Sequence, residues 1–188
     1  TLEFRNINFN YFNRDNKVLD NLNFKIKKGD FIGIKGQSGS GKSTFINVFL
    51  GFLKPSSGEI ILNENKIHDI YYFMLKNANY IPQDIFLYDE TILENIVFDL
   101  NNIDNDKLQN SLNKSNCNEF INDLPQGLNT KIGENGYSLS GGQKQRLAIA
   151  RSFYFDKKII ILDESFSSLD MKTESKIINE IVKLKNEI

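Results

Sequence analysis

The feature of this sequence that most constrains its fold is a glycine-rich segment at residues 36–44, which reads GQSGSGKST. Before it, residues 31–34 form a short apolar run that predicts a strand. After it, the pattern of residues 43–53 predicts a helix, which Lys54 and Pro55 end. A strand, a tight loop and a helix in this order are typical of an α/β fold. We therefore expect further strands and helices of that class in the rest of the chain.

The same segment matches the pattern of a phosphate-binding loop. Glycines let the backbone wrap closely around phosphate oxygens, and the start of the following helix adds partial positive charge. Lys42 would bring a full charge to the β- and γ-phosphates, and the Ser43 hydroxyl would bind Mg²⁺. We therefore expect ATP and Mg²⁺ as cofactors. The residues expected to bind the nucleotide here are Gly36, Gln37, Ser38, Gly39, Ser40, Gly41, Lys42, Ser43 and Thr44.

A second segment, residues 158–164, supplies carboxylates at the end of an apolar run. Residues 159–162 (IIIL) predict a buried parallel strand, and Asp163 and Glu164 follow it directly. Asp163 would hold Mg²⁺ through the water shell of the ion. Glu164 would orient or deprotonate an attacking water, because a general base must lie within hydrogen-bond reach of the nucleophile. Acidic residues also end strands as solvated edges, so this reading depends on the phosphate-binding loop.

Composition narrows the class of protein without naming a partner. The formal net charge of −1 and pI near 5.9 give no sign, in bulk electrostatics, of a basic surface for nucleic acid or an anionic membrane. Cys117 is the only cysteine, which excludes an internal disulfide and predicts a small packing residue. Apolar runs fall short of the roughly 20 residues that span a bilayer. The length of 188 residues predicts one domain.

Hydrophobic periodicity predicts the remaining elements. Apolar and polar residues alternate over residues 2–11 and 18–26, which favours an antiparallel sheet at the start of the chain. Short strands are expected at 59–62 and 80–81, a helical region without a convincing strand at 84–139, and a helix at 140–155. An amphipathic helix is expected from residue 173 to the end, with Ile177, Ile181 and Leu184 facing inward.

The segment 139–143, LSGGQ, matches letter for letter the signature motif of ATP-binding cassette (ABC) proteins, and the chain resembles that family. Ser140 and Gln143 also form a capping box, which any helix can use, but capping alone does not need two glycines. In the family this helix end meets the γ-phosphate held by the opposite subunit. The resemblance implies a homodimer, or a pairing with a second nucleotide-binding domain, in which Ser140, Gly141, Gly142 and Gln143 contact the shared nucleotide.

Other positions resemble the family in the same order. Tyr11 stands where the family stacks an aromatic ring on adenine, and a strand aromatic in a core is the alternative. Gln83 resembles the Q-loop glutamine, which touches Mg²⁺ and water. Residues 167–170 (SSLD) resemble the D-loop at the dimer interface, although Ser165-Phe166 departs from the usual small residues. The resemblance implies Glu164, Gln83 and Lys42 as catalytic residues and Ser43, Gln83 and Asp163 as metal ligands.

Two segments are similar to the exporter branch of the family. Residues 124–136 resemble the stretch before the signature in which Glu134 would contact intracellular loops of a transporter, and residues 91–96 (TILENI) resemble the exporter sequence after the Q-loop. A polar loop and a helix start would give the same local pattern. The resemblance implies a transmembrane domain as partner, fused N-terminally, and a position at the cytoplasmic face of the inner membrane.

We therefore expect an α/β fold with a phosphate-loop NTPase (RecA-like) core, an antiparallel β subdomain and an inserted α-helical subdomain. One nucleotide-binding domain would span 1–188, with 1–83 and 156–188 forming the β subdomain and core and 84–155 the helical subdomain. The family carries a switch histidine on a strand beyond the D-loop, and this sequence has no histidine after residues 167–170. We therefore expect the C-terminal end of the cassette to be missing and ATPase activity to be weak. His68, the only histidine, is expected in a surface loop.

The expected function is ATP binding and hydrolysis in an ABC exporter, with dimerisation around Mg·ATP driving translocation and with no nucleic acid bound. The alternative is a soluble ABC ATPase that acts on ribosomes or DNA. Such proteins usually carry tandem cassettes, a long coiled coil or a basic surface, which this sequence does not have. A phosphate-loop kinase would not need the signature. Lipid-linked glycans, lipids, peptides and drugs all stay open as substrates.

Overall fold

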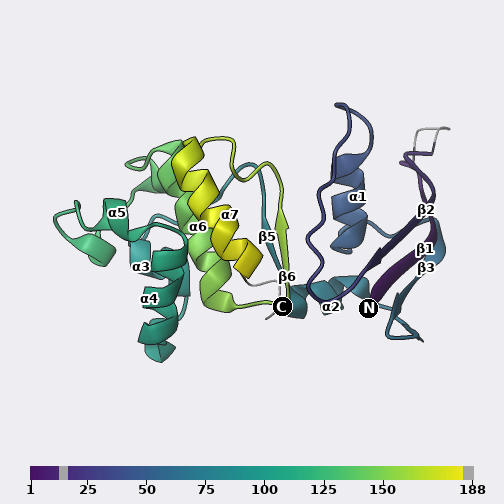
Figure 1. The fold of residues 1–188 in the computed structure, drawn as a ribbon, viewed down its shortest axis with the longest axis horizontal. Helices are drawn as coiled ribbons and strands as arrows, with labels where there is room; N and C mark the ends of the chain where they lie inside the picture. Colours follow the sequence, from purple (N-terminus) through teal and green to yellow (C-terminus); the bar gives the residue numbers. More distant parts are fainter. Residues whose placement is uncertain (13–16, 184–188) are drawn as a thin grey trace. The chain divides into compact units, whose positions relative to one another are not determined.

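The computed structural model describes residues 1–12 and 17–183, which divide into two compact units, Thr1–Asn77 and Ala78–Leu184 (Figure 1). The division falls between Asn77 and Ala78, and the expected subdomain limits after residues 83 and 155 stay predictions. Among the described residues, no helix combines the length and the apolar character that crossing a membrane requires.

The first unit is built on an antiparallel sheet with the strand order β2-β1-β3-β4, as the alternating pattern predicts. Its strands are β1 (Leu2–Phe9), β2 (Leu19–Ile26), β3 (Ser57–Leu62) and β4 (Asn65–Lys66). The buried positions of β1 switch from even to odd numbers between Phe4 and Ile7 because the pairing shifts register there. Asn6 has a φ of 51° at this irregularity, a left-handed value that asparagine tolerates better than most residues.

Helix α1 (Lys42–Phe49) packs on this sheet through aromatic rings. The ring of Phe49 stacks on Phe4 at 5.2 Å between centroids, and Phe45 meets Phe24 edge to face at 5.2 Å. Such ring pairs add about 1 kcal/mol to the burial of their apolar area. The glycine-rich loop that precedes α1 is therefore attached to a helix that the sheet holds.

Helix α1 ends at Phe49, earlier than the expected residue 53, and helix α2 (Ile70–Asn77) was not predicted. Both differences involve Gly51, which follows α1 and has a φ of 80°. A Cβ atom at Gly51 would lie 2.5 Å from the backbone nitrogen of Tyr71, so only glycine permits this approach of the two segments.

The expected strand at residues 31–34 is absent from the first unit, where these residues have no regular secondary structure. A strand is defined by hydrogen bonds to a neighbouring strand, and the four-stranded sheet of this unit does not include this segment. The apolar run identified a segment suited to a strand, but it carried no information about a partner.

The second unit contains a parallel pair, β5 (Ala78–Ile81) and β6 (Ile159–Leu162), with Ile81 opposite Leu162. The expected parallel strand at 159–162 is confirmed. Its four residues are half-buried, whereas the apolar run predicted full burial. In the described residues β6 pairs with β5 alone, which leaves its other edge without a strand.

Helices occupy the region expected to be helical, and α6 (Gly141–Phe155) forms its centre (Figure 1). The other helices of the second unit are α3 (Ile92–Val97), α4 (Asn105–Lys114), α5 (Asn118–Ile121) and α7 (Met171–Lys183), with 3₁₀ turns at Leu100–Asn102, Gly127–Asn129 and Glu134–Gly136. The core includes Leu147, Ile96 and Cys117, each fully buried. Burial raises the pKa of the Cys117 thiol to about 12, which suits the expected packing role.

Helix α7 is amphipathic as expected, with Ile177 fully buried and Ile181 half-buried. Leu184, the third residue expected to face inward, lies outside the described residues. Asp170 begins this helix by accepting a hydrogen bond of 3.0 Å from the backbone of Thr173. Hydrogen bonds from Thr173, first from its side chain and then from its backbone, lower the pKa of the carboxyl. His68 is exposed in a bend, as predicted.

Candidate functional site

The glycine-rich loop of the first unit is closed by Lys42. The ammonium of Lys42 donates hydrogen bonds of 2.8 Å to the carbonyl of Gly36 and 2.9 Å to that of Gln37. The lysine therefore reaches back across the whole loop to its first residues. Residues 36–40 are exposed, which leaves their backbone accessible to a ligand.

At two positions of this loop, contacts with neighbouring atoms explain why the residue is glycine. A Cβ atom at Gly36 would lie 2.6 Å from Oγ of Ser40, so the Ser40 side chain would have to turn away. Gly41 has a φ of 92° directly before α1, and its Cβ would lie 3.2 Å from the carbonyl oxygen of Val18. The loop thus forms a cradle that depends on missing side chains.

Tyr11 lies beside the start of α1. Its hydroxyl shares a hydrogen bond of 3.1 Å with Oγ1 of Thr44, and its ring meets Phe9 edge to face at 5.0 Å. The side chain is 38% exposed, so one part of the ring is free to contact a ligand. The structure therefore brings Tyr11 and the loop together within the first unit, as the sequence predicted.

In the second unit Asp163 stands at the end of the parallel pair. Its backbone nitrogen donates to the carbonyl of Ile81 at 3.0 Å and so extends the ladder by one residue. The hydroxyl of Tyr80 donates a hydrogen bond of 3.1 Å to Oδ2 of Asp163. Burial, and then the nearby carboxylate, raise the pKa of Tyr80 to about 12. Tyr80 therefore stays a neutral donor that orients the carboxylate.

Glu164, the next residue, has a φ of 50°, which is uncommon for glutamate and costs on the order of 1 kcal/mol. The hydroxyl of Ser165 donates to the carbonyl of Ile81 at 2.9 Å and holds the turn. The exposed carboxylate of Glu164 accepts a hydrogen bond of 2.8 Å from Nε2 of Gln83. Three predicted residues, Gln83, Asp163 and Glu164, therefore lie at one end of the parallel pair.

The signature segment begins α6 as a capped helix. The hydroxyl of Ser140 accepts from the backbone of Gln143 at 3.3 Å, and the side chain of Gln143 accepts from the backbone of Ser140 at 2.8 Å. Both halves of the predicted capping box are present. Ser140 and Gly141 are exposed at the helix start, where backbone N–H groups favour an anion.

The exporter-like segment at residues 91–96 also begins as a capped helix. Thr91 accepts from the backbone of Glu94 at 3.2 Å, and the Glu94 carboxylate accepts from the Thr91 backbone at 3.0 Å. Hydrogen bonds from Thr91, first from its side chain, lower the pKa of Glu94. Glu134 is exposed in the 3₁₀ turn before the signature, the position in which a partner could reach it.

The sequence did not reveal a contact between two polar residues, the buried Asn95 and the half-buried Arg151. Asn95 is fully buried; its amide donates to the carbonyls of Tyr88 and Thr91 at 3.0 Å and accepts from the Tyr88 backbone at 2.9 Å. Arg151 of α6 donates to the Asn95 carbonyl at 2.8 Å. Burial lowers the pKa of Arg151. An asparagine on an otherwise apolar helix face was the signal that could have identified this pair.

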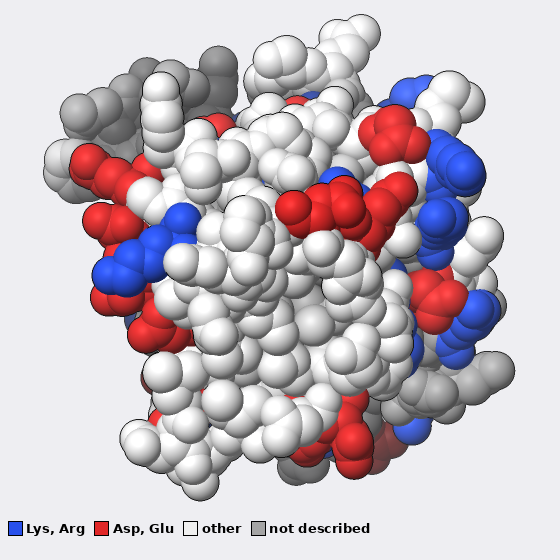
Figure 2. Space-filling model, turned by 90° about the vertical axis from the view of Figure 1, so that its left-hand side faces the viewer, with Lys and Arg blue, Asp and Glu red and all other residues white. Residues whose placement is uncertain are grey.

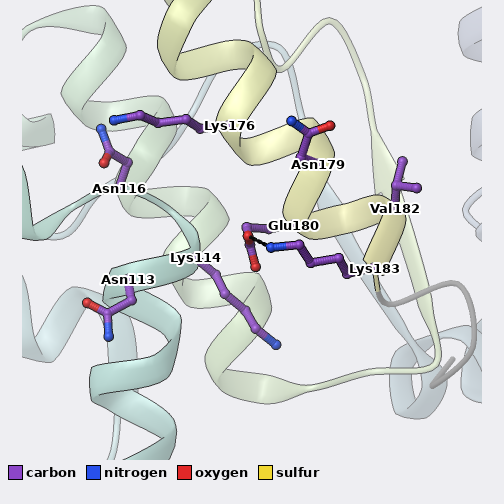
Figure 3. Close-up of a pocket in the computed structure, with 8 residues that line it drawn as sticks. All are labelled: Asn113, Lys114, Asn116, Lys176, Asn179, Glu180, Val182 and Lys183. Carbon is purple, nitrogen blue, oxygen red and sulfur yellow. Dashed lines mark hydrogen bonds and ion pairs between the residues drawn. The ribbon is translucent and has the colours of Figure 1, made fainter.

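A pocket of about 520 Å³ between α4 and α7 contains none of the predicted site residues (Figure 3). Its lining is polar except for Val182, and Lys183 and Glu180 form an ion pair along α7 on one wall. The other lining residues are Asn113, Lys114, Asn116, Lys176 and Asn179. The pocket has neither a glycine-rich loop nor paired carboxylates, so it lacks the features that the sequence predicts for a nucleotide site.

Comparison with known proteins places this chain in a family. The ABC transporter family model matches residues 19–167. A Rickettsia typhi protein whose name describes an export ATP-binding/permease protein is 40% identical over 98% of this chain and 32% of its own length. The ATP-dependent lipid A-core flippase of Pseudomonas aeruginosa is 38% identical over 97% of this chain and 31% of its own length. The chain thus spans about a third of these relatives.

A solved structure is similar to this one along nearly the whole chain. A bacterial Atm1-family ABC exporter with ATP bound has a TM-score of 0.88 and 32% identity, and the match covers 98% of this chain and 32% of that chain. The expected fold class is confirmed by this match. These relatives are exporters or a flippase by name, and none of them supports the alternative of an ATPase acting on ribosomes or DNA. The chain therefore belongs to the ABC transporter family.

Proposed function

We propose that this chain binds Mg·ATP and hydrolyses it as the nucleotide-binding domain of an ABC exporter. The observation that carries the proposal is the loop at residues 36–44, which Lys42 spans and in which Gly39 and Gly41 have left-handed φ values of 78° and 92° that favour glycine. A triphosphate fits such a cradle because the missing side chains let phosphate oxygens approach the backbone N–H groups.

The residues present also fit a magnesium ion. The Ser43 hydroxyl is exposed at the start of α1, and the Asp163 carboxylate is fixed by Tyr80; both are the oxygen ligands that Mg²⁺ prefers. Mg²⁺ usually keeps several waters in protein sites, so it needs only one or two ligands from side chains. When bound, Mg²⁺ would neutralise charge that develops on the β- and γ-phosphates.

Side chains of this protein would carry out the other steps of nucleotide binding and hydrolysis. Lys42 binds the phosphates, and Tyr11 packs against the adenine. Glu164 accepts the proton of the attacking water, and Gln83 holds that carboxylate in place until the water is bound. The start of α6, at Ser140 and Gly142, contacts a phosphate held by a second nucleotide-binding domain.

We further propose that the transmembrane domain of the exporter contacts an exposed row of aromatic rings after the Q-loop. Phe86 meets Tyr88 at 5.1 Å, Tyr88 meets Phe98 at 5.8 Å, and Phe98 stacks on Phe155 at 5.6 Å between centroids. Between 37% and 61% of each of these side chains is exposed. Contiguous exposed apolar surface marks an interaction site. The domain would then lie at the cytoplasmic face of the inner membrane.

The net charge favours a protein partner over a nucleic acid, since the formal value is −1. In the face shown in Figure 2 the middle is mostly uncharged, and Lys and Arg lie toward the left and right edges. Binding to a phosphate backbone depends on clustered Lys and Arg side chains.

The test of the proposed function is the rate of ATP hydrolysis by the full-length protein and its Glu164→Gln variant. Wild-type protein should hydrolyse Mg·ATP, and the variant should lose most turnover, on the order of 100-fold or more. ATP-driven dimerisation, followed by light scattering, should persist in the variant because glutamine keeps the shape of the side chain that it replaces. Loss of dimerisation together with hydrolysis would contradict the role proposed for Glu164.

A further inference from the structure

Gln145 is a buried polar residue in α6 that the proposed mechanism does not use. Its side chain is 3% exposed. Its Oε1 accepts a hydrogen bond of 3.1 Å from the backbone of Ser168, and its Nε2 donates one of 3.3 Å to Oγ of Ser167. Both ends of the amide therefore bind the D-loop-like segment at residues 167–170, which follows the carboxylate pair in the sequence.

The same segment lies against the first turn of α6. A Cβ atom at Gly142 would lie 2.9 Å from the carbonyl oxygen of Ser168, and one at Gly141 would lie 3.3 Å from Cβ and Oγ of Ser168. The two signature glycines therefore have a packing role within one protomer, in addition to any contact with a phosphate. No larger residue would allow the backbone of Ser168 to approach Gly142 this closely.

The segment also leads back to Glu164. The backbone of Ser167 donates to the carbonyl of Glu164 at 3.2 Å, and the backbone of Leu169 donates to that of Phe166 at 3.0 Å. These turns connect the residue that Gln145 holds with the strained residue whose carboxylate is the proposed base. A buried amide satisfied at both ends fixes such a turn, because a change in the turn would leave the amide of Gln145 buried and unpaired.

We propose that Gln145 is a positioning residue that fixes residues 164–169 against the start of α6. The consequence is that the proposed base Glu164 and the signature segment of the same protomer keep one relative geometry. In the dimer these two parts serve different nucleotides, so Gln145 couples the two ATP sites. This inference rests on the proposed function.

The test compares the full-length protein with its Gln145→Met variant. Methionine has a similar length and volume but removes the donor and the acceptor. We expect the kcat of ATP hydrolysis to fall roughly tenfold, the order expected when a hydrogen bond that orders the site is lost. The Hill coefficient for ATP should fall toward one. The Kd for Mg·ATP should stay within about twofold, because the phosphate-binding loop belongs to the other unit.

Two further variants make the result decisive. Ser167→Ala removes only the hydrogen bond to Nε2 of Gln145 and should lower kcat by about threefold, with wild-type folding. Gln109→Met is the matched control, because Gln109 is exposed in α4 and its change should leave kcat and the Hill coefficient unaltered. Ser167→Ala carries the test if Gln145→Met does not fold.

Several outcomes would overturn the inference. If Gln145→Met lowers the melting temperature while kcat per folded molecule and the Hill coefficient stay at wild-type values, Gln145 is only structural. Unchanged kcat in Ser167→Ala would lead to the same conclusion. If the wild-type protein hydrolyses no ATP, the proposed function itself fails. If the wild type and Gln145→Met both hydrolyse ATP at the same rate, only the role of Gln145 fails.

Discussion

The side-chain amide of Gln83 donates a hydrogen bond of 2.8 Å to the carboxylate of Glu164. The two residues follow β5 and β6, whose last residues, Ile81 and Leu162, are directly paired. The carboxyl ends of parallel strands meet at the same edge of a sheet, which is where ligands bind in α/β folds. The contact therefore links the proposed catalytic carboxylate with the loop that leads to the exposed aromatic row.

Replacing Gln83 by Glu would place a second carboxylate in this contact. The amide donor is lost, and two carboxylates at hydrogen-bond distance repel each other, so the proposed base should leave its position. We expect kcat to fall by about tenfold or more. Gln126→Glu adds the same charge at an exposed position and should leave kcat unchanged. An unchanged kcat in Gln83→Glu would mean that the contact does not form during turnover.

The hydroxyl of Tyr80 is expected to titrate late because its pKa is raised to about 12. A phenol with a raised pKa stabilises the fold fully below its unfolded value of about 10, and this contribution is lost as the pH rises through about 12. Tyr80→Phe should therefore remove the latest tyrosine transition from an alkaline absorbance titration. It should also lower kcat about threefold to tenfold through the lost contact to Asp163. A titration identical to that of the wild type would contradict the assignment.

Asn95 should be a stability determinant, because its buried amide makes three hydrogen bonds to the backbone of Tyr88 and Thr91. Asn95→Ala leaves these buried groups unpaired and should cost about 2–4 kcal/mol in the free energy of unfolding measured with urea. Asn122→Ala, at an exposed position, should stay within about 0.5 kcal/mol of wild type. Equal stabilities of the two variants would mean that water replaces the amide at residue 95.

The sequence predicted the elements whose signal is local. The glycines of the loop at residues 36–44, the capping box of Ser140 and Gln143 and the alternation of β1 each depend on neighbours within a few residues. The parallel strand at 159–162 was also correctly predicted, since an apolar run of this length followed by two carboxylates is typical of such strands.

The sequence could not predict features that depend on distant residues. The strand expected at residues 31–34 lacks a partner within its own unit, and the end of α1 is set by the approach of Tyr71 to Gly51. The contacts of Gln145 with Ser167 and Ser168 join residues that are 22 and 23 positions apart in the sequence. No periodic pattern identifies such a pair, because hydrogen-bond partners depend on tertiary packing.

The central claim is that the loop closed by Lys42 binds a triphosphate, and isothermal titration of the full-length protein with Mg·ATP tests it most directly. We predict saturable binding by the wild type and a loss of at least about tenfold in affinity in Lys42→Ala, since that variant removes the charge that contacts the phosphates. Absence of Mg·ATP binding by well-folded wild-type protein would contradict the account.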